Sequence, residues 1–200
     1  MSHYFTDNSN LPSNRREITY VINGTSFKLF VDNGVFSKGH LDQGSKIFIE
    51  TLLKVNLGNN VLDIGCGYGP IGLTLAKLTP SMNVICSDVN TRALGLCIEN
   101  VSALKVSHQV TCLQSDIYTN IEGKFDSIVS NPPIRAGKKV TYEIYKGALS
   151  HLVDGGSLYI VIRKAQGALS AKEYIESLFG NSEILAKEKG YYVIKATKAN

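Results

Sequence analysis

The sequence lacks the features that mark membrane, secreted and metal-binding proteins. No apolar run approaches the roughly 18 residues that a membrane-spanning helix needs. The first eight residues have neither the basic start nor the apolar core of a signal peptide. The histidines are scattered and the cysteines have no CxxC spacing, so we expect reduced, buried thiols and no metal site. These absences together predict a cytoplasmic protein without a bound metal or a membrane partner.

Tryptophan is absent and only 19% of the residues are charged, whereas 44% are hydrophobic. This composition suits one globular unit of 200 residues with disorder confined to its ends. Basic residues outnumber acidic ones between positions 131 and 146, and this excess predicts contact with a polyanion such as nucleic acid. A solvated loop and helix face is the alternative. The residues concerned are Arg135, Lys138, Lys139 and Lys146, against Glu143.

From residue 58 to residue 200 the pattern alternates strands and helices, which predicts a parallel α/β sheet. The expected strands are 61–64, 83–87, 110–114, 125–130 and 158–162, and the expected helices are 70–78, 91–103, 142–153 and 167–179. Asp154-Gly155-Gly156 is a typical stop signal for the third of these helices. Strands 183–186 and 191–196 are joined by too few residues for a parallel crossover, so we expect an antiparallel hairpin.

Residues 1–57 precede this alternation and are expected to belong to the same compact unit. Two β-rich runs, 17–22 and 25–31, flank Asn23-Gly24, a dipeptide that favours a hairpin turn because it tolerates positive φ. Apolar residues at helical spacing predict a helix over 46–55. The division is therefore a small N-terminal hairpin and helix followed by a nucleoside-binding domain over 58–200.

A glycine-rich turn after strand 61–64 predicts a nucleoside cofactor. Its residues 67–72 match GxGxxG, so a nicotinamide or flavin must be considered. Asp63 before Gly65 can meet a ligand ammonium, and alternating glycines let the backbone press against a nucleoside, which favours S-adenosylmethionine. Asp88 ends the next strand, where a carboxylate can accept ribose hydroxyls; Asp116 can receive an adenine amino group or, alternatively, cap a turn. The expected cofactor-binding residues are Asp63, Gly65, Cys66, Gly67, Gly69, Asp88, Val89, Asp116, Ile117 and Asn131.

Asn131-Pro132-Pro133-Ile134 follows strand 125–130 and predicts the reacting centre. The Asn131 side-chain oxygen and the Pro132 carbonyl can hold both N–H groups of a planar amine and aim its lone pair at a methyl group. Two prolines fix the turn and remove two backbone donors. An ordinary Asn-Pro turn is the structural alternative.

These motifs, Asp63 to Gly69 and Asn131 to Ile134, resemble those of class I methyltransferases that modify nitrogen. With Gly34-Val35-Phe36-Ser37 and Leu41 to Ser45, they are similar to the "small" methyltransferase domain, the catalytic half of the ribosomal RNA small subunit methyltransferase C family. The resemblance implies a Rossmann-like, mostly parallel sheet of seven strands in the order 3-2-1-4-5-7-6. It also implies S-adenosylmethionine as cofactor and methylation of guanine N2 in ribosomal RNA or the 30S particle, with Phe36 and Ser37 over the pocket.

Two departures from that family bear on the substrate. Ile134 stands where the family usually has an aromatic residue that stacks on the target base. We therefore expect stacking that is either weaker or supplied from elsewhere, with Phe36, Tyr142 and Tyr145 as the candidates. The family's extra N-terminal half has no counterpart here, so the hairpin and the basic residues Arg135, Lys138 and Lys139 are expected to supply RNA contacts. Adenine N6 and a protein glutamine remain alternative acceptors, and a nicotinamide-dependent oxidoreductase and a silent RNA-binding scaffold remain alternative functions.

Overall fold

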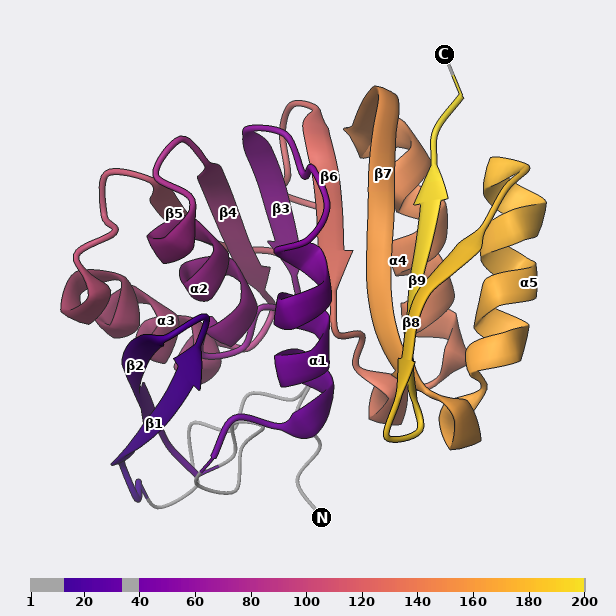
Figure 1. Ribbon diagram of the computed structural model, residues 1–200. Helices are drawn as coiled ribbons and strands as arrows, with labels where there is room; N and C mark the ends of the chain where they lie inside the picture. Colours follow the sequence, from indigo (N-terminus) through magenta and orange to yellow (C-terminus); the bar gives the residue numbers. More distant parts are fainter. Residues whose placement is uncertain (1–12, 34–39, 200) are drawn as a thin grey trace.

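The computed structural model describes residues 13–33 and 40–199 (Figure 1). A two-stranded hairpin precedes a seven-stranded sheet with the order β5-β4-β3-β6-β7-β9-β8. The strands are β1 (Arg16–Ile22), β2 (Thr25–Val31), β3 (Asn60–Ile64), β4 (Asn83–Asp88), β5 (Val110–Gln114), β6 (Phe125–Ser130), β7 (Leu152–Arg163), β8 (Glu183–Glu188) and β9 (Tyr191–Thr197). The α-helices are α1 (Gln43–Leu52), α2 (Pro70–Leu78), α3 (Thr91–Leu104), α4 (Lys138–His151) and α5 (Ala168–Phe179).

The strand order confirms the predicted Rossmann-like sheet, since the seven strands taken in chain order are arranged 3-2-1-4-5-7-6. β9 alone runs against its neighbours β7 and β8. The β8–β9 turn is the two residues Lys189-Gly190, both with positive φ, rather than the expected four-residue link. Such a turn fits the twist of a hairpin, and too few residues remain for a crossover.

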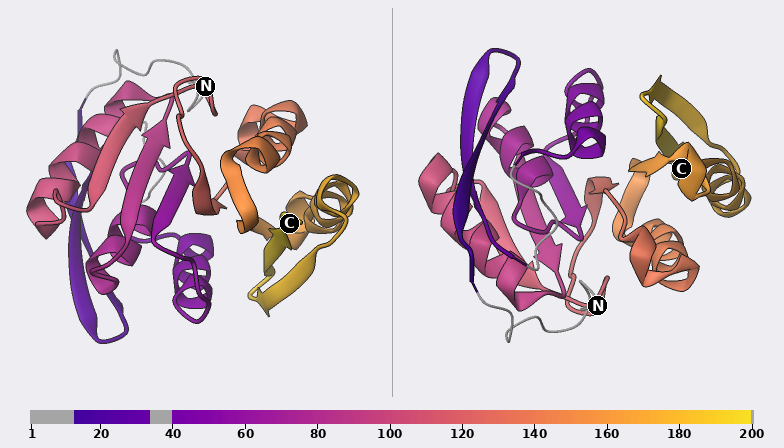
Figure 2. Two further views of the ribbon diagram at one scale, coloured as in Figure 1. Left: turned by 90° about the horizontal axis from the view of Figure 1, so that it is seen from above. Right: turned by 90° about the horizontal axis from the view of Figure 1, so that it is seen from below.

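Alternate residues along the central strands enter two separate cores. In β3, Val61 packs on the face covered by α1, α2 and α3, whereas Leu62 and Ile64 pack on the face covered by α4 and α5. Because both faces are covered, the strands are apolar on both sides. The result is a three-layer arrangement, with helices on both faces of the sheet (Figure 2).

The N-terminal hairpin packs on the outer side of α3 (Figure 2). Asn100 of α3 fixes it there, because its side chain accepts from Phe30 N at 2.7 Å and donates to the carbonyls of Phe30 and Tyr68. The hairpin's end is held by a 2.8 Å ion pair between Asp32 and Arg92. Burial by itself would raise the pKa of Asp32, but the Arg92 guanidinium and nearby backbone N–H groups lower it to about 2.

Two predicted helix boundaries are wrong. Helix α1 begins at Gln43 instead of residue 46, because Asp42 caps it by accepting from Ser45 N at 3.0 Å. Helix α4 covers Lys138–His151 rather than 142–153, and the expected stop Asp154-Gly155-Gly156 lies inside β7. The helix ends early because Leu152 already pairs with Phe125 of β6, and the glycines then take up a register shift.

Among the described residues, no helix combines the length and the apolar composition needed to cross a membrane.

Candidate active site

A cavity of about 800 Å³ opens at the carboxyl ends of β3, β4 and β6. The cavity brings together the motif Asp63 to Gly69 and the motif Asn131 to Ile134, although 61 residues or more separate them in sequence. Of the predicted site residues, those that line it are Gly65, Cys66, Gly67, Asp88, Val89, Asp116, Ile117, Asn131, Pro132, Pro133 and Ile134. A smaller cavity of about 250 Å³ lies at the amino ends of the strands, beside Asn60 and Asn83. Ligands of open α/β sheets bind at the carboxyl ends, so the larger cavity is the candidate site.

The glycine-rich turn connects β3 to α2 in a conformation that only glycine adopts readily. Gly65, Gly67 and Gly69 all have positive φ, and Gly69 stands immediately before Pro70, the first residue of α2. Gly65 N donates to the carbonyl of Ser87 at 2.9 Å, which holds the turn against β4. Apart from its two chain neighbours, no described residue has an atom within 4 Å of a Cβ placed on Gly65. The turn therefore presents bare backbone to the cavity.

Asp88, the last residue of β4, forms part of the cavity lining. One of its carboxylate oxygens accepts from Gly67 N and the other from Asn90 N, each at 2.8 Å. The side chain is almost fully buried yet lines the cavity. The carboxylate is thus fixed between the glycine-rich turn and the start of α3, where the predicted contact with ribose hydroxyls has a preorganised acceptor.

Asp63 and Gly69 do not line the cavity. Asp63 is wholly buried beneath the turn, where its Oδ2 accepts from Gly72 N at 2.9 Å. Its Oδ1 has no hydrogen-bond partner among the described residues. Burial raises the pKa of Asp63 to about 7, an effect that the Gly72 N–H opposes and the nearby Asp88 carboxylate increases.

Asp116 and Ile117 follow β5 and reach the same cavity. Ile117 has a φ of 50°, which is uncommon for a β-branched residue. The Ser115 hydroxyl donates to the Ile117 carbonyl at 2.9 Å, and Ser115 N donates to the carbonyl of Asp88 at 3.1 Å. Tertiary contacts thus maintain a strained backbone at this edge, as is common where ligands bind.

Two acceptors are expected in the Asn131 turn, the Asn131 side-chain oxygen and the Pro132 carbonyl, and only the carbonyl already accepts a hydrogen bond from a described residue. Asn131 Nδ2 donates to Ser45 Oγ at 3.1 Å, and no described residue donates to its side-chain oxygen. The Pro132 carbonyl accepts from Ile134 N at 2.8 Å, so a substrate amine would use its second lone pair. The Ser45 contact orients the Asn131 amide with its oxygen available as an acceptor.

Sequence reasoning missed several lining residues that come from distant elements. Asp42 and Ser45 belong to the segment Leu41 to Ser45, whose resemblance to the family was the sequence signal that could have found them. No sequence signal pointed to Arg163 of β7 or Tyr191 of β9. The Tyr191 ring packs so closely on α1 that a Cβ on Gly44 would lie 2.6 Å from it. The Arg163 guanidinium lies 4.9 Å from the centre of the same ring, within cation–π range.

The predicted substrate contacts have different outcomes. Lys138 and Lys139 are exposed at the start of α4, next to the cavity-lining Ala136 and Val140. Arg135 lies in the 3₁₀ turn Ile134–Ala136. Phe36 and Ser37 lie outside the described residues.

The two tyrosines offered as stacking groups lie elsewhere. Tyr145 is buried in the core on the α4 side of the sheet. Tyr142 stacks on Tyr174 of α5 with ring centres 4.0 Å apart. Neither lines the cavity. Their expected place over the target base is therefore wrong, since α4 directs the Tyr142 ring onto α5 and buries Tyr145 in the core.

Residues 26–195 match a protein family described as the methyltransferase small domain. The chain is 41% identical to the uncharacterized protein YbxB of Bacillus subtilis, over 98% of both chains. It is 37% identical to ribosomal RNA small subunit methyltransferase C of Serratia proteamaculans, covering 83% of this chain and 47% of that protein. The chain thus spans about half the length of that relative.

Among solved structures, the chain resembles the T. thermophilus 16S rRNA N2 G1207 methyltransferase (RsmC) in complex with AdoMet and guanosine. The TM-score is 0.82 at 28% identity, over 94% of this chain and 52% of that one. A methyltransferase from Pyrococcus furiosus, at 22% identity and a TM-score of 0.65, shares the fold.

Proposed function

The chain belongs to the methyltransferase small domain family, and from this premise we propose that it is an S-adenosylmethionine-dependent N-methyltransferase. Its proposed acceptor is the exocyclic N2 of a guanine in small-subunit ribosomal RNA. The observation that carries the proposal is the meeting of the glycine-rich turn and Asn131-Pro132-Pro133-Ile134 in one cavity. Family membership argues against the nicotinamide-dependent alternative, although residues 67–72 match GxGxxG.

The residues of the cavity fit the proposed cofactor. The bare backbone at Gly65 offers room for the amino-acid moiety, Asp88 offers acceptors for the ribose, and Asp116 with Ile117 offers an acceptor and an apolar face for the adenine. When bound, S-adenosylmethionine supplies a methyl group on a sulfonium, which is already a good leaving group. The protein then has to align the acceptor and stabilise the charge that develops on it.

Asn131 is the proposed catalytic residue. An exocyclic amine is a poor nucleophile because its lone pair is delocalised into the ring. The Asn131 side-chain oxygen and the second lone pair of the Pro132 carbonyl would accept its two N–H groups, and the resulting bonds strengthen as the nitrogen becomes positive. Ser45 is a positioning residue, since its hydroxyl accepts from Asn131 Nδ2 at 3.1 Å and keeps the amide oxygen toward the substrate.

The groups around the mouth of the cavity support an RNA substrate. Exposed Lys138 and Lys139 can neutralise phosphates beside the cavity. Ile134 gives the base an apolar contact without an aromatic ring, and Tyr191 lines the same cavity with Arg163 against its face. We assign to Tyr191 the stacking contact that the sequence had suggested for other aromatic residues, because single-stranded RNA bases stack on such rings.

Transfer of labelled methyl groups from S-adenosylmethionine to unmodified 30S particles and to protein-free 16S RNA tests this proposal. Nucleoside analysis should find the label on N2-methylguanosine, and Asn131→Ala should greatly slow its appearance without preventing cofactor binding. Label on adenosine or on a protein glutamine would keep the chemistry and replace the acceptor. Normal transfer by Asn131→Ala would overturn the proposed mechanism, and absence of cofactor binding would overturn the function.

A further inference from the structure

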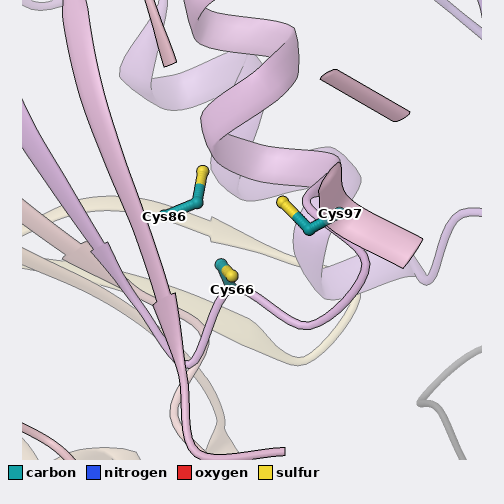
Figure 3. A group of neighbouring side chains, drawn as sticks. All are labelled: Cys66, Cys86 and Cys97. Atoms are coloured by element: carbon teal, nitrogen blue, oxygen red, sulfur yellow. The ribbon is translucent and has the colours of Figure 1, made fainter. Parts of the chain in front are cut away.

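Three cysteine thiols meet directly beneath the glycine-rich turn (Figure 3). Cys66 belongs to the turn itself, Cys86 to β4 and Cys97 to α3. All three are buried, and their sulfur atoms lie within 4.8 Å of one another. These three thiols are free and buried, as expected, but the fold also gathers them into one place although they show no metal-binding spacing along the chain.

The sheet register explains the meeting. Asp63, Cys86 and Cys112 are paired across β3, β4 and β5, so their side chains form one row on the face that α3 covers. The Cys97 side chain packs on this row from α3, and its sulfur lies 3.5 Å from that of Cys112. The row also contains a carboxylate oxygen without a partner among the described residues, Asp63 Oδ1.

The thiols fill the space that the glycines of the turn leave. A Cβ on Gly69 would lie 2.7 Å from the sulfur of Cys97, and one on Gly72 would lie 2.6 Å from that of Cys86. On its other side, Cys66 lines the cofactor cavity. The cluster thus lies directly under the turn, and a metal ion can reach it from the cavity.

We propose that Cys66, Cys86 and Cys97 bind one soft metal ion of the class of Cu⁺ or Cd²⁺, as three thiolates around it. Thiolates select such ions over hard ones, and each bound thiol releases its proton to solvent. For metal–sulfur bonds of about 2.3 Å, three sulfurs in a plane around the ion lie about 4 Å apart. Sulfurs already within 4.8 Å of one another need to move by less than about 1 Å each to reach this geometry.

Binding at this place would act on the turn. Drawing Cys66 toward Cys86 and Cys97 pulls on the residue between Gly65 and Gly67, both of which line the cavity. We therefore expect the metal to weaken cofactor binding. This second expectation rests on the proposed function, whereas occupancy of the thiols does not.

The site is tested with the full chain, reduced by a phosphine and freed of metal, then titrated with Cd²⁺. We expect one ion per chain, an ultraviolet thiolate-to-cadmium charge-transfer band and three sulfur ligands by X-ray absorption. Mg²⁺ should not bind. Cys66→Ser and Cys97→Ala should each lose the band, whereas the neighbouring variant Cys112→Ala should keep it.

The X-ray absorption measurement on the unmodified chain decides the matter even if a variant fails to fold. Less than one ion per chain, ligation by oxygen or nitrogen, or an unchanged band in folded Cys97→Ala would overturn the site. For the coupling, Cd²⁺ should weaken S-adenosylhomocysteine binding about tenfold in the unmodified chain but not in Cys97→Ala. Equal affinity with and without Cd²⁺ would overturn the coupling alone, and no nucleoside binding in either state would count against the proposed function instead.

Discussion

Asn in place of Asp63 should change how the stability of this protein depends on pH. Asp63 is wholly buried on β3, where Oδ2 accepts from Gly72 N and Oδ1 has no partner among the described residues. Burial raises its pKa from 3.8 to about 7. The folded protein thus holds a proton on Asp63 over a pH range in which the unfolded chain has released it.

The sign and size follow from this difference. Because the folded state binds the extra proton, the contribution of Asp63 is most favourable below about pH 4 and declines until the pH passes about 7. The full penalty is about 4 kcal/mol, and roughly 2–3 kcal/mol of it develops between pH 5 and pH 8. Asp63→Asn does not titrate, so its free energy of unfolding relative to the unmodified chain should rise by that amount over this interval.

Urea unfolding of both proteins at several pH values between about 5 and 8 measures this effect. The comparison at each pH cancels the titration of the groups that do not interact with Asp63, whatever fixed loss the new amide causes. Asp154→Asn is the control, because the hydrogen bond from Lys198 lowers the pKa of that exposed carboxyl, and its effect falls at lower pH. A stability difference for Asp63→Asn that stays constant from pH 5 to pH 8 would show that the pKa of Asp63 is not raised in the folded protein.

Three further predictions concern catalysis, RNA binding and packing. In single-turnover assays, Asn131→Ala should slow methyl transfer by about 10²–10³-fold with unchanged cofactor affinity, because one preorganised acceptor is lost; a loss of cofactor affinity instead would reassign the residue. Lys138→Ala should reduce the salt dependence of RNA binding by about one ion, measured by titration at several salt concentrations, and an unchanged slope would contradict its phosphate contact. Gly147→Ala should lower the free energy of unfolding by about 1–3 kcal/mol, because its Cβ would lie 2.4 Å from the Tyr118 ring. In the matched helical variant Gly95→Ala, the new Cβ meets no described residue within 4 Å outside its own helix turn, so this change should raise the free energy of unfolding by about 0.5–1 kcal/mol; the opposite order in urea unfolding would contradict both.

Local patterns determined most of the architecture. Apolar strands of five or six residues alternated with helices, and this alternation dictated a parallel sheet with its ligand site at the strand ends. The alternating glycines after β3 permit positive φ, which other residues adopt rarely, so the turn was visible in the sequence. The short link between β8 and β9 likewise required a hairpin, because a parallel crossover needs about a dozen residues and the link has far fewer.

The distant groups that complete the site are brought together by the folding of the chain. Ser45 meets Asn131 across 86 positions of sequence, and Tyr191 reaches the cavity because β9 inserts beside β7. The thiols of Cys66, Cys86 and Cys97 converge through strand register and the packing of α3, neither of which leaves a spacing pattern. The alternation of strands and helices, the glycine-rich turn and the Asn-Pro-Pro-Ile turn could be predicted from the sequence, because they depend on residues near one another along the chain. The partners of those turns were decided by long-range packing, because they depend on which elements become neighbours in the folded chain.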